Sequence, residues 1–262
     1  MKLKGEKIKK FLIIFAAFCL VLMTGYQILI PFLDFFQKKQ EEKQNQPINN
    51  ELEEKTSELI NEIKAQKQPS KIKENVLLKV PFAPQAPYGI WDKLHNEACE
   101  EAALIMVHYF LKEEDLTKEK MEKEIQDLVS WQIKKWGKHK DLTLAEVGEM
   151  AKEYYGWQKI KILDKITIDD IKKELSNGNA VIVPTAGRLL GNPYYRQPGP
   201  YYHMLVVRGY KKDKIITNDP GTKRGENFSY SEKVLAQAIH DWPGEEKDIS
   251  TGEKKMLVIE SR

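Results

Sequence analysis

The hydrophobic and polar positions divide the chain into three stretches of different character. Residues 11–33 are apolar almost throughout, residues 34–77 are dominated by Lys, Glu, Gln and Asn, and residues 78–262 mix apolar and polar positions. The last stretch is long enough to bury one hydrophobic core. We therefore predict a single globular domain over residues 78–262.

Inside this domain the spacing of apolar residues changes from helical to strand-like. Apolar side chains that recur every three or four positions predict helices at 96–112, 118–129, 143–155 and 168–175. Short β-branched or apolar runs predict strands at 77–82, 180–184, 203–210, 214–218 and 255–260, and a further helix is expected at 231–241. Because most helices precede most strands, and a tight turn at 211–213 joins two strands, the predicted fold class is α+β with a C-terminal antiparallel sheet.

The apolar stretch at 11–33 is long enough to cross a lipid bilayer. As a helix it spans roughly 35 Å at about 1.5 Å per residue, against about 30 Å of hydrocarbon. Five lysines lie among residues 1–10, and the positive-inside rule assigns such a tail to the cytoplasm. A cleaved signal peptide is the alternative, but Met23-Thr24-Gly25 is a poor cleavage site. We predict a cytoplasmic tail at 1–10, a transmembrane signal-anchor at 11–33, and a single-pass cell-membrane protein whose C-terminal domain is extracytoplasmic.

Residues 34–77 are expected to form a polar, partly helical stalk between the anchor and the domain. Leu52, Leu59 and Ile63 line one narrow stripe of a helix that begins near Glu51. We favour a solvated spacer helix, and weak self-association through this stripe is the alternative.

The net charge excludes one class of partner. The chain has 42 Lys and Arg residues against 39 Asp and Glu residues, so its formal net charge is +3. Since five of the lysines belong to the N-terminal tail, the remainder is close to neutral and lacks the basic excess that binds a phosphate backbone. We expect no nucleic-acid partner. The sequence has no metal-binding or phosphate-binding motif, so we also predict no metal and no cofactor.

Cys99 is the first candidate for chemistry. The chain has two cysteines, and if Cys19 lies in the membrane, Cys99 has no intrachain disulfide partner. Cys99 shares a helical stripe with Ala103 and Met106, so a buried small hydrophobe is one interpretation. A reactive thiol is the other, because a helix capped by Asn96 would hold Cys99 in its first turn, where the helix dipole stabilises a thiolate.

A thiolate at this position needs a cationic partner, because Glu97, Glu100 and Glu101 oppose its charge. Most of the five histidines are poor candidates. His95 belongs to the loop before the helix, His108 lies half a turn off the stripe, His139 is expected in a solvated basic turn, and His240 is expected on a helix surface or in packing.

His203 is the preferred partner, because it begins an apolar strand and so lies at the end of a sheet. The hairpin formed with the next strand returns Asp219 to its side, where a carboxylate orients the second ring nitrogen of the base. A turn or cap role before Pro220 is the alternative for Asp219.

Four ordered stretches carry a resemblance to a known family. They are Val-Pro-Phe-Ala-Pro-Gln-Ala-Pro at 80–87, Ala-Cys-Glu-Glu-Ala at 98–102, His-Met-Leu-Val-Val-Arg-Gly-Tyr at 203–210 and Asn-Asp-Pro at 218–220. Over residues 78–262 the chain resembles the cysteine peptidases of the bacteriocin-leader-processing group, family thirty-nine, in its free-standing exported branch. The resemblance implies a papain-like fold, with Cys99 as nucleophile, His203 as general base, Asp219 as its orienter and Gln85 in the oxyanion hole.

Two departures from the family pattern limit what transfers. Glu100-Glu101 follows the cysteine where the bacteriocin processors carry a small pair, and the interval between Gln85 and Cys99 is longer. We expect Trp91, from that longer interval, to contact substrate together with Tyr201 and Tyr202 from the Pro-rich loop before His203. Packing is the alternative role for these tyrosines. No attached transporter or ATP-binding motif accompanies the domain, so specificity for a double-glycine leader is not implied.

The leading hypothesis is therefore a membrane-anchored extracytoplasmic cysteine peptidase that acts on peptides or on peptidoglycan peptides. A peptidoglycan amidase or an acyltransferase would use the same triad. A non-catalytic wall-binding or partner-binding module on the same fold is the alternative from another class, and the acidic pair beside the thiol is its support.

Overall fold

The computed structural model describes residues 72–260. The predicted tail, the predicted anchor and most of the predicted stalk lie outside these residues. Within residues 72–260, no helix is both long and apolar enough to cross a membrane.

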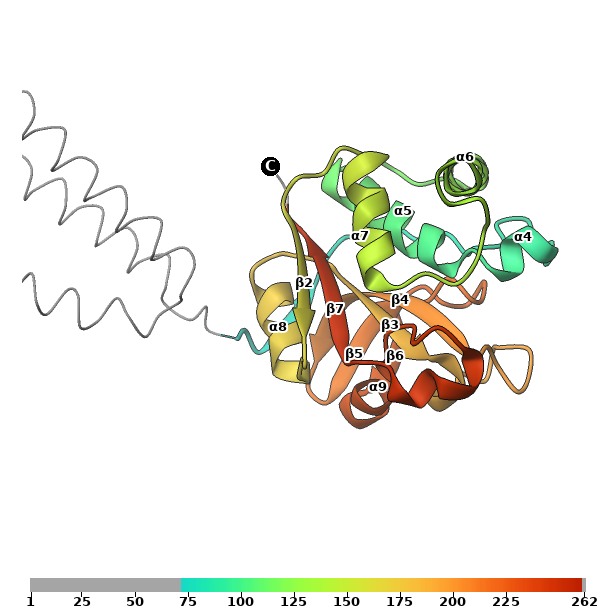
Figure 1. Cartoon of the computed structure of the whole chain (residues 1–262). Helices are drawn as coiled ribbons and strands as arrows, with labels where there is room; N and C mark the ends of the chain where they lie inside the picture. The colour runs from blue at the N-terminus through green and yellow to red at the C-terminus, as the bar shows by residue number, and fades with distance from the viewer. Residues whose placement is uncertain (1–71, 261–262) are drawn as a thin grey trace, which may run out of the picture. The chain divides into compact units, whose positions relative to one another are not determined.

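Seven strands form one antiparallel sheet (Figure 1). They are β1 (Asn75–Leu77), β2 (Ile160–Asp164), β3 (Val181–Ala186), β4 (Tyr202–Lys211), β5 (Lys214–Asn218), β6 (Phe228–Ser231) and β7 (Lys255–Ile259). The order across the sheet is β2-β7-β3-β4-β5-β6, and β1 also pairs with β4. The long β4 therefore has three antiparallel partners and lies where distant parts of the chain meet.

Helices cover both faces of this sheet. Figure 1 shows α5 (Cys99–Leu111), α6 (Lys118–Trp136) and α7 (Leu144–Glu153) on one side, with α8 (Ile168–Ser176) and α9 (Glu232–Ala238) on the other. The short α4 (Lys93–Asn96) precedes α5, and the 3-10 helices are η1 (Gly187–Leu190) and η2 (Glu246–Thr251).

Each face of the sheet has its own hydrophobic core. Met204 and Val206 of β4 belong to the core formed with α5, α6 and α7, whereas Leu205 and Val207 belong to the core formed with α8 and α9. Successive side chains of a strand point to opposite faces, so a segment buried on both faces is apolar at consecutive positions. This explains the continuous apolar run at residues 204–207 of β4.

The α+β class with an antiparallel sheet is confirmed, and the predicted helices are present with adjusted ends. The helices expected at 143–155 and 168–175 start at capping boxes, formed by Thr143 with Glu146 and by Thr167 with Asp170. The helix expected at 118–129 continues to Trp136 and ends at Gly137, whose φ of 79° suits a residue without Cβ. The strands β2 and β6 are additions that the sequence pattern does not predict.

The strand expected at 77–82 is wrong in its position. The ladder ends at Leu77, and Val76 pairs with Tyr210 across β1 and β4. Beyond Leu77 one more backbone bond follows, from the N–H of Leu78 to the carbonyl of Arg208 at 2.8 Å. Side chains then hold the chain, because Arg208 donates to the carbonyl of Leu78 and Asn218 Nδ2 donates to the carbonyls of Val80 and Pro81 at 3.1 Å each. The last residues of the predicted stalk therefore belong to the sheet.

Candidate active site

Cys99 is the first residue of α5. The predicted cap is wrong, because Asn96 ends the preceding α4 and the N-cap of α5 is Ala98, which makes no side-chain hydrogen bond to the helix. Cys99 still occupies the first helical turn, where backbone N–H groups lack intrahelical acceptors. Its side chain is 5% exposed, and that small fraction faces a groove.

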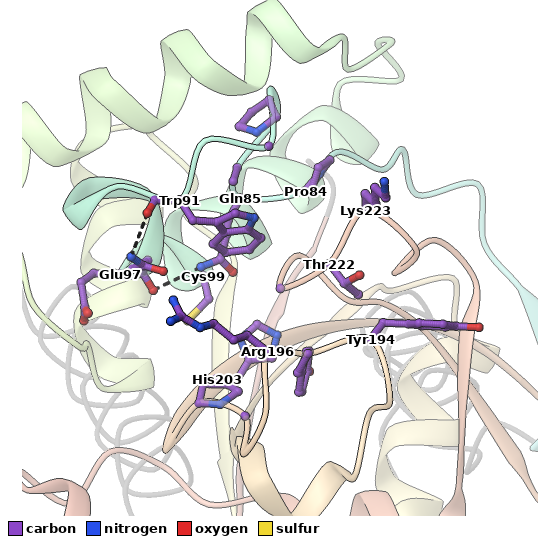
Figure 2. A pocket seen from close by; sticks show the side chains of 18 of the residues that line it. Pro84, Gln85, Trp91, Glu97, Cys99, Tyr194, Arg196, His203, Thr222 and Lys223 are labelled. Atoms are coloured by element: carbon purple, nitrogen blue, oxygen red, sulfur yellow. Dashed lines mark hydrogen bonds between the residues drawn. The ribbon is translucent and has the colours of Figure 1, made fainter.

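The groove has a volume of about 1230 Å³ and contains Cys99, His203 and Gln85 together (Figure 2). The three side chains expected to contact substrate also line it. Trp91 is 45% and Tyr201 40% exposed, whereas Tyr202 is buried and donates its hydroxyl to the carbonyl of Leu142 at 2.8 Å. Trp91 and Tyr201 thus present open aromatic surface, and Tyr202 serves the packing of the groove wall.

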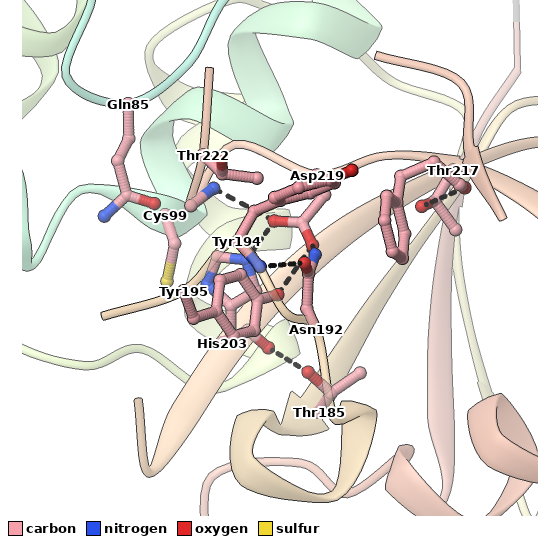
Figure 3. Close-up of polar contacts among 12 residues, drawn as sticks. Gln85, Cys99, Thr185, Asn192, Tyr194, Tyr195, His203, Thr217, Asp219 and Thr222 are labelled. Carbon is pink, nitrogen blue, oxygen red and sulfur yellow. Dashed lines mark hydrogen bonds and ion pairs between the residues drawn. The ribbon is translucent and has the colours of Figure 1, made fainter. Parts of the chain in front are cut away.

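The imidazole of His203 is paired with Asp219. Nε2 lies 2.8 Å from Asp219 Oδ1, at the end of the hairpin formed by β4 and β5 (Figure 3). Because the carboxylate accepts from Nε2, the neutral imidazole carries its proton there and leaves the lone pair on Nδ1. Figure 3 shows the sulfur of Cys99 pointing toward this imidazole. The sequence-predicted base and orienter are therefore in contact, and the base lines the groove that contains the thiol.

Asp219 is buried, yet it remains an acceptor-rich carboxylate. Its Oδ2 accepts from Tyr195 at 2.6 Å, from Tyr230 at 2.6 Å and from Asn192 at 2.9 Å, and its Oδ1 accepts from the N–H of Gly221 at 3.0 Å. Burial by itself would raise the pKa of Asp219. The charge of His203 and the hydrogen bonds from His203, Tyr195 and Tyr230 outweigh burial and lower that pKa.

The residues that hold Asp219 are the ones that sequence reasoning misses. Asn192 and Tyr195 come from the loop after η1, and Tyr230 comes from the unpredicted β6. Gly221 has a second role, since a Cβ there would lie 2.9 Å from His203 Cε1. The Pro-rich, Tyr-rich loop before His203 could have identified Tyr195 as a site residue. No sequence pattern points to Asn192 or Tyr230, because only the folded sheet brings them to Asp219.

Gln85 lies in the groove beside Cys99 (Figure 3), and its side chain is engaged with the main chain. Nε2 donates to the carbonyl of His95 at 2.8 Å and to that of Asn96 at 3.3 Å. Oε1 is buried and has no hydrogen-bond partner among the described residues. Both amide hydrogens are thus occupied, and the longer bond, to Asn96, is the weaker one.

The acidic residues after the nucleophile have different partners. Glu100 is fully buried, its Oε2 lies 3.0 Å from Cys99 Sγ, and its Oε1 accepts from the N–H of Leu142 at 2.9 Å. Burial raises the pKa of the Cys99 thiol well above its ordinary value, and the carboxyl groups of Glu100, Asp141 and Glu101 raise it further. The sequence predicts that acidic neighbours oppose a thiolate at Cys99, and among these neighbours Glu100, in direct contact with the sulfur, has the largest effect.

Glu101 turns away from the thiol, and this corrects the expectation for His139. Glu101 Oε1 accepts from Gln132 Nε2 and lies 3.3 Å from His139 Nε2. His139 is therefore a half-buried partner of Glu101 rather than part of a solvated turn.

The other histidines have structural partners away from the sulfur. His108 accepts from Trp157 Nε1 at 3.1 Å, His240 Nδ1 lies 2.8 Å from the carbonyl of Gly252, and His95 bridges Asp92 and Glu122. Among residues 72–260, His203 is the histidine that lines the groove with Cys99. No cluster of metal-ligating side chains occurs within the same residues.

Comparison with known proteins gives one family. The sequence model of the Peptidase_C39 like family matches residues 77–244, which is more than half of the chain. A C39-like peptidase from Bacillus anthracis is similar at 16% identity and a TM-score of 0.48, over 72% of this chain and 100% of that one. Xylellain, a cysteine protease from Xylella fastidiosa, is similar at 12% identity and a TM-score of 0.43, over 74% of this chain and 88% of that one. No curated protein matches the chain.

Proposed function

Because the chain belongs to the Peptidase_C39 like family and is a cysteine-type peptidase, we propose that it hydrolyses peptide bonds with Cys99 as nucleophile, His203 as general base and Asp219 as the residue that orients His203. The observation that carries the proposal is the His203–Asp219 pair at 2.8 Å, because its imidazole lines the groove that also holds a thiol at the start of a helix. Cys99 and His203 thus come from distant parts of the chain to one groove, and Asp219 contacts the imidazole from the protein interior.

The proposed reaction begins with proton transfer from the Cys99 thiol to His203 Nδ1. The thiolate attacks the substrate carbonyl carbon and forms a tetrahedral oxyanion, and collapse of this intermediate breaks the carbon–nitrogen bond. The leaving amine takes the proton from Nδ1, and a thioester to Cys99 remains. Water then attacks the thioester with His203 as base, which releases the acid and restores the thiol. Asp219 stabilises the imidazolium in both halves of the reaction.

The proposed oxyanion hole consists of the backbone N–H of Cys99, at the uncapped start of α5, and the amide of Gln85. Gln85 would exchange its longer hydrogen bond, the 3.3 Å contact with Asn96, for the bond to the oxyanion. The 2.8 Å bond to the carbonyl of His95 would hold the amide in position meanwhile.

The proposed substrates are peptides or the peptide part of peptidoglycan, bound with the help of the exposed rings of Trp91 and Tyr201 in the groove. The proposed setting is the outer face of the cell membrane, with residues 11–33 as anchor. Its support is the apolar run and the five lysines that precede it. External protease added to intact cells should remove a C-terminal epitope tag. A tag that is protected until the cells are lysed would argue against this orientation.

The test of the activity uses the full-length chain with a peptide library and, in parallel, with muropeptides. Cleavage that disappears in Cys99→Ser and in His203→Ala, with unchanged melting temperatures, is the expected result. Cleavage that persists in Cys99→Ser would remove Cys99 as nucleophile. Products joined to an added amine, in place of hydrolysed ones, would identify an acyltransferase, and release of an amide-linked wall fragment would identify an amidase.

A further inference from the structure

Glu100 is the buried acid that the proposed reaction leaves unused, although it touches the reacting atom. Its side chain is fully buried, and its Oε2 lies 3.0 Å from Cys99 Sγ. An ionised carboxylate at this distance would oppose the thiolate that the reaction requires. A cysteine peptidase therefore needs this carboxyl group in another form.

We propose that Glu100 works as a neutral carboxylic acid. When the thiol proton moves to His203 Nδ1, the O–H of Glu100 donates a hydrogen bond to the thiolate of Cys99. No proton is gained or lost in this step: one proton passes from sulfur to Nδ1, and the proton of Glu100 stays on Oε2. This inference rests on the proposed role of Cys99 as nucleophile.

The surroundings of Glu100 favour the neutral form. Among the described residues no Lys, Arg or His forms an ion pair with it, since His139 is the ion-pair partner of Glu101. The titratable groups that face it are Cys99 and Glu101 from α5, Asp141 from the loop before α7, and Tyr202 from β4. Burial raises the pKa of Glu100 well above its ordinary value, and the charges of Glu101 and Asp141 raise it further, against the opposing hydrogen bonds from Cys99 and Leu142.

The backbone fixes which oxygen carries the proton. Oε1 accepts from the N–H of Leu142 at 2.9 Å, so this oxygen has to remain an acceptor. The hydrogen of a neutral Glu100 therefore sits on Oε2, which is the oxygen that faces Cys99 Sγ. The same N–H would orient the amide of a glutamine at this position, with its oxygen toward Leu142 and its NH₂ group toward the sulfur.

The test compares Glu100→Gln with Glu100→Met in the full-length chain. The two side chains are similar in length, but only glutamine keeps a donor toward the sulfur. The readout is the rate of iodoacetamide labelling at Cys99 as a function of pH, followed on the peptide that contains Cys99 so that Cys19 does not interfere. Melting temperatures of all variants, and kcat/KM on a cleaved peptide, accompany it.

We expect the labelling rate of Glu100→Gln near neutral pH to stay within about threefold of the wild type, because one neutral donor replaces another. Glu100→Met should label about ten- to hundredfold more slowly, the usual effect of losing a hydrogen bond to a charged group. At alkaline pH the wild type should lose reactivity relative to Glu100→Gln, because only glutamic acid can ionise beside the sulfur.

A labelling rate that rises tenfold or more in Glu100→Gln would overturn the proposal, because it would mean that an ionised carboxylate holds the thiolate back. Equal rates in Glu100→Met and the wild type would also overturn it. If Glu100→Met fails to fold, the sign of the change in Glu100→Gln still decides between the neutral and the ionised acid. Peptide cleavage that persists in Cys99→Ser would instead contradict the proposed function itself, independently of the labelling rates of the Glu100 variants.

Discussion

Gly221 offers a direct test of how closely His203 has to be positioned. A Cβ at this residue would lie 2.9 Å from His203 Cε1, 3.0 Å from His203 Nε2 and 3.1 Å from Tyr195 Cε1. Gly221 is not among the residues with positive φ, so the backbone accepts alanine. Alanine also keeps the N–H that donates to Asp219 Oδ1. Gly221→Ala therefore adds one methyl group against the imidazole and, slightly farther away, against the ring of Tyr195.

The expected effect follows from the overlap. Apolar atoms in contact stay about 3.5 Å apart, so a contact of 2.9 Å requires the imidazole to move by roughly 0.6 Å. A misplacement of about 1 Å in a catalytic constellation costs about a hundredfold in rate. We therefore expect Gly221→Ala to lower kcat/KM by roughly tenfold, with a smaller fall in the labelling rate of Cys99 and little change in melting temperature.

The assay measures kcat/KM on a cleaved peptide beside the thermal melt, with Gly148→Ala as the matched control. A Cβ at Gly148 would meet its nearest neighbours at 3.5 Å, an ordinary contact, within α7 and away from the groove. This control should keep full activity and gain up to about 1 kcal/mol of stability, because alanine is the better helix former. Full activity in Gly221→Ala would refute the reasoning, since it would mean that His203 can shift without cost.

Three further predictions concern the neighbours of the site. Asp219→Asn removes the charge that faces His203 Nε2, so kcat/KM should fall by about ten- to a hundredfold while the protein stays folded; a change within about threefold would argue that Asp219 is a packing residue. Thr143→Ala removes the capping box of α7 and should cost about 1 kcal/mol in chemical unfolding without loss of activity; equal unfolding midpoints would contradict this. Burial, with the charges of Glu97 and Glu246, raises the pKa of Asp141 from 3.8 to about 7, so the folded state holds this proton more tightly than the unfolded chain and is destabilised as pH rises from about 4 to about 7. Asp141→Asn should therefore gain more in melting temperature over the wild type near pH 8 than near pH 5, and a pH-independent difference would count against the shifted pKa.

The pairing of His203 with Asp219 was predictable because a hairpin is a local rule. A two-residue loop, Lys212-Asp213, joins β4 and β5, and antiparallel pairing returns the end of the second strand to the start of the first. Counting along the hairpin is not exact, because the register shifts between Val207 and Gly209. Arg208 is the extra residue of this β-bulge, and its side chain donates to the carbonyl of Leu78. No sequence pattern predicts such a bulge.

The start of α5 was predicted less well because two signals overlap there. Asn96 stands before a helical pattern and so reads as a cap, but Asp92 already caps a separate short helix through the N–H of His95. The break between α4 and α5 frees the carbonyls of His95 and Asn96, which then accept from Gln85. The position of Gln85 thus depends on a helix boundary that propensity alone does not resolve.

The chemistry on the two sides of Cys99 explains why the sequence left the state of the thiol open. On one side Asp219 holds an imidazole through its Nε2, and this pair favours a thiolate. On the other side the sulfur touches Glu100, and Asp141 and Glu101 add to the acidic surroundings. With all three acids ionised the carboxylates would outnumber the single imidazolium, and a buried thiol would keep its proton. A thiolate at Cys99 can form beside these acids only if the carboxyl group of Glu100, which contacts the sulfur, is neutral. Its neutrality depends on burial, and the residue types that follow Cys99 in the sequence do not show which of them are buried.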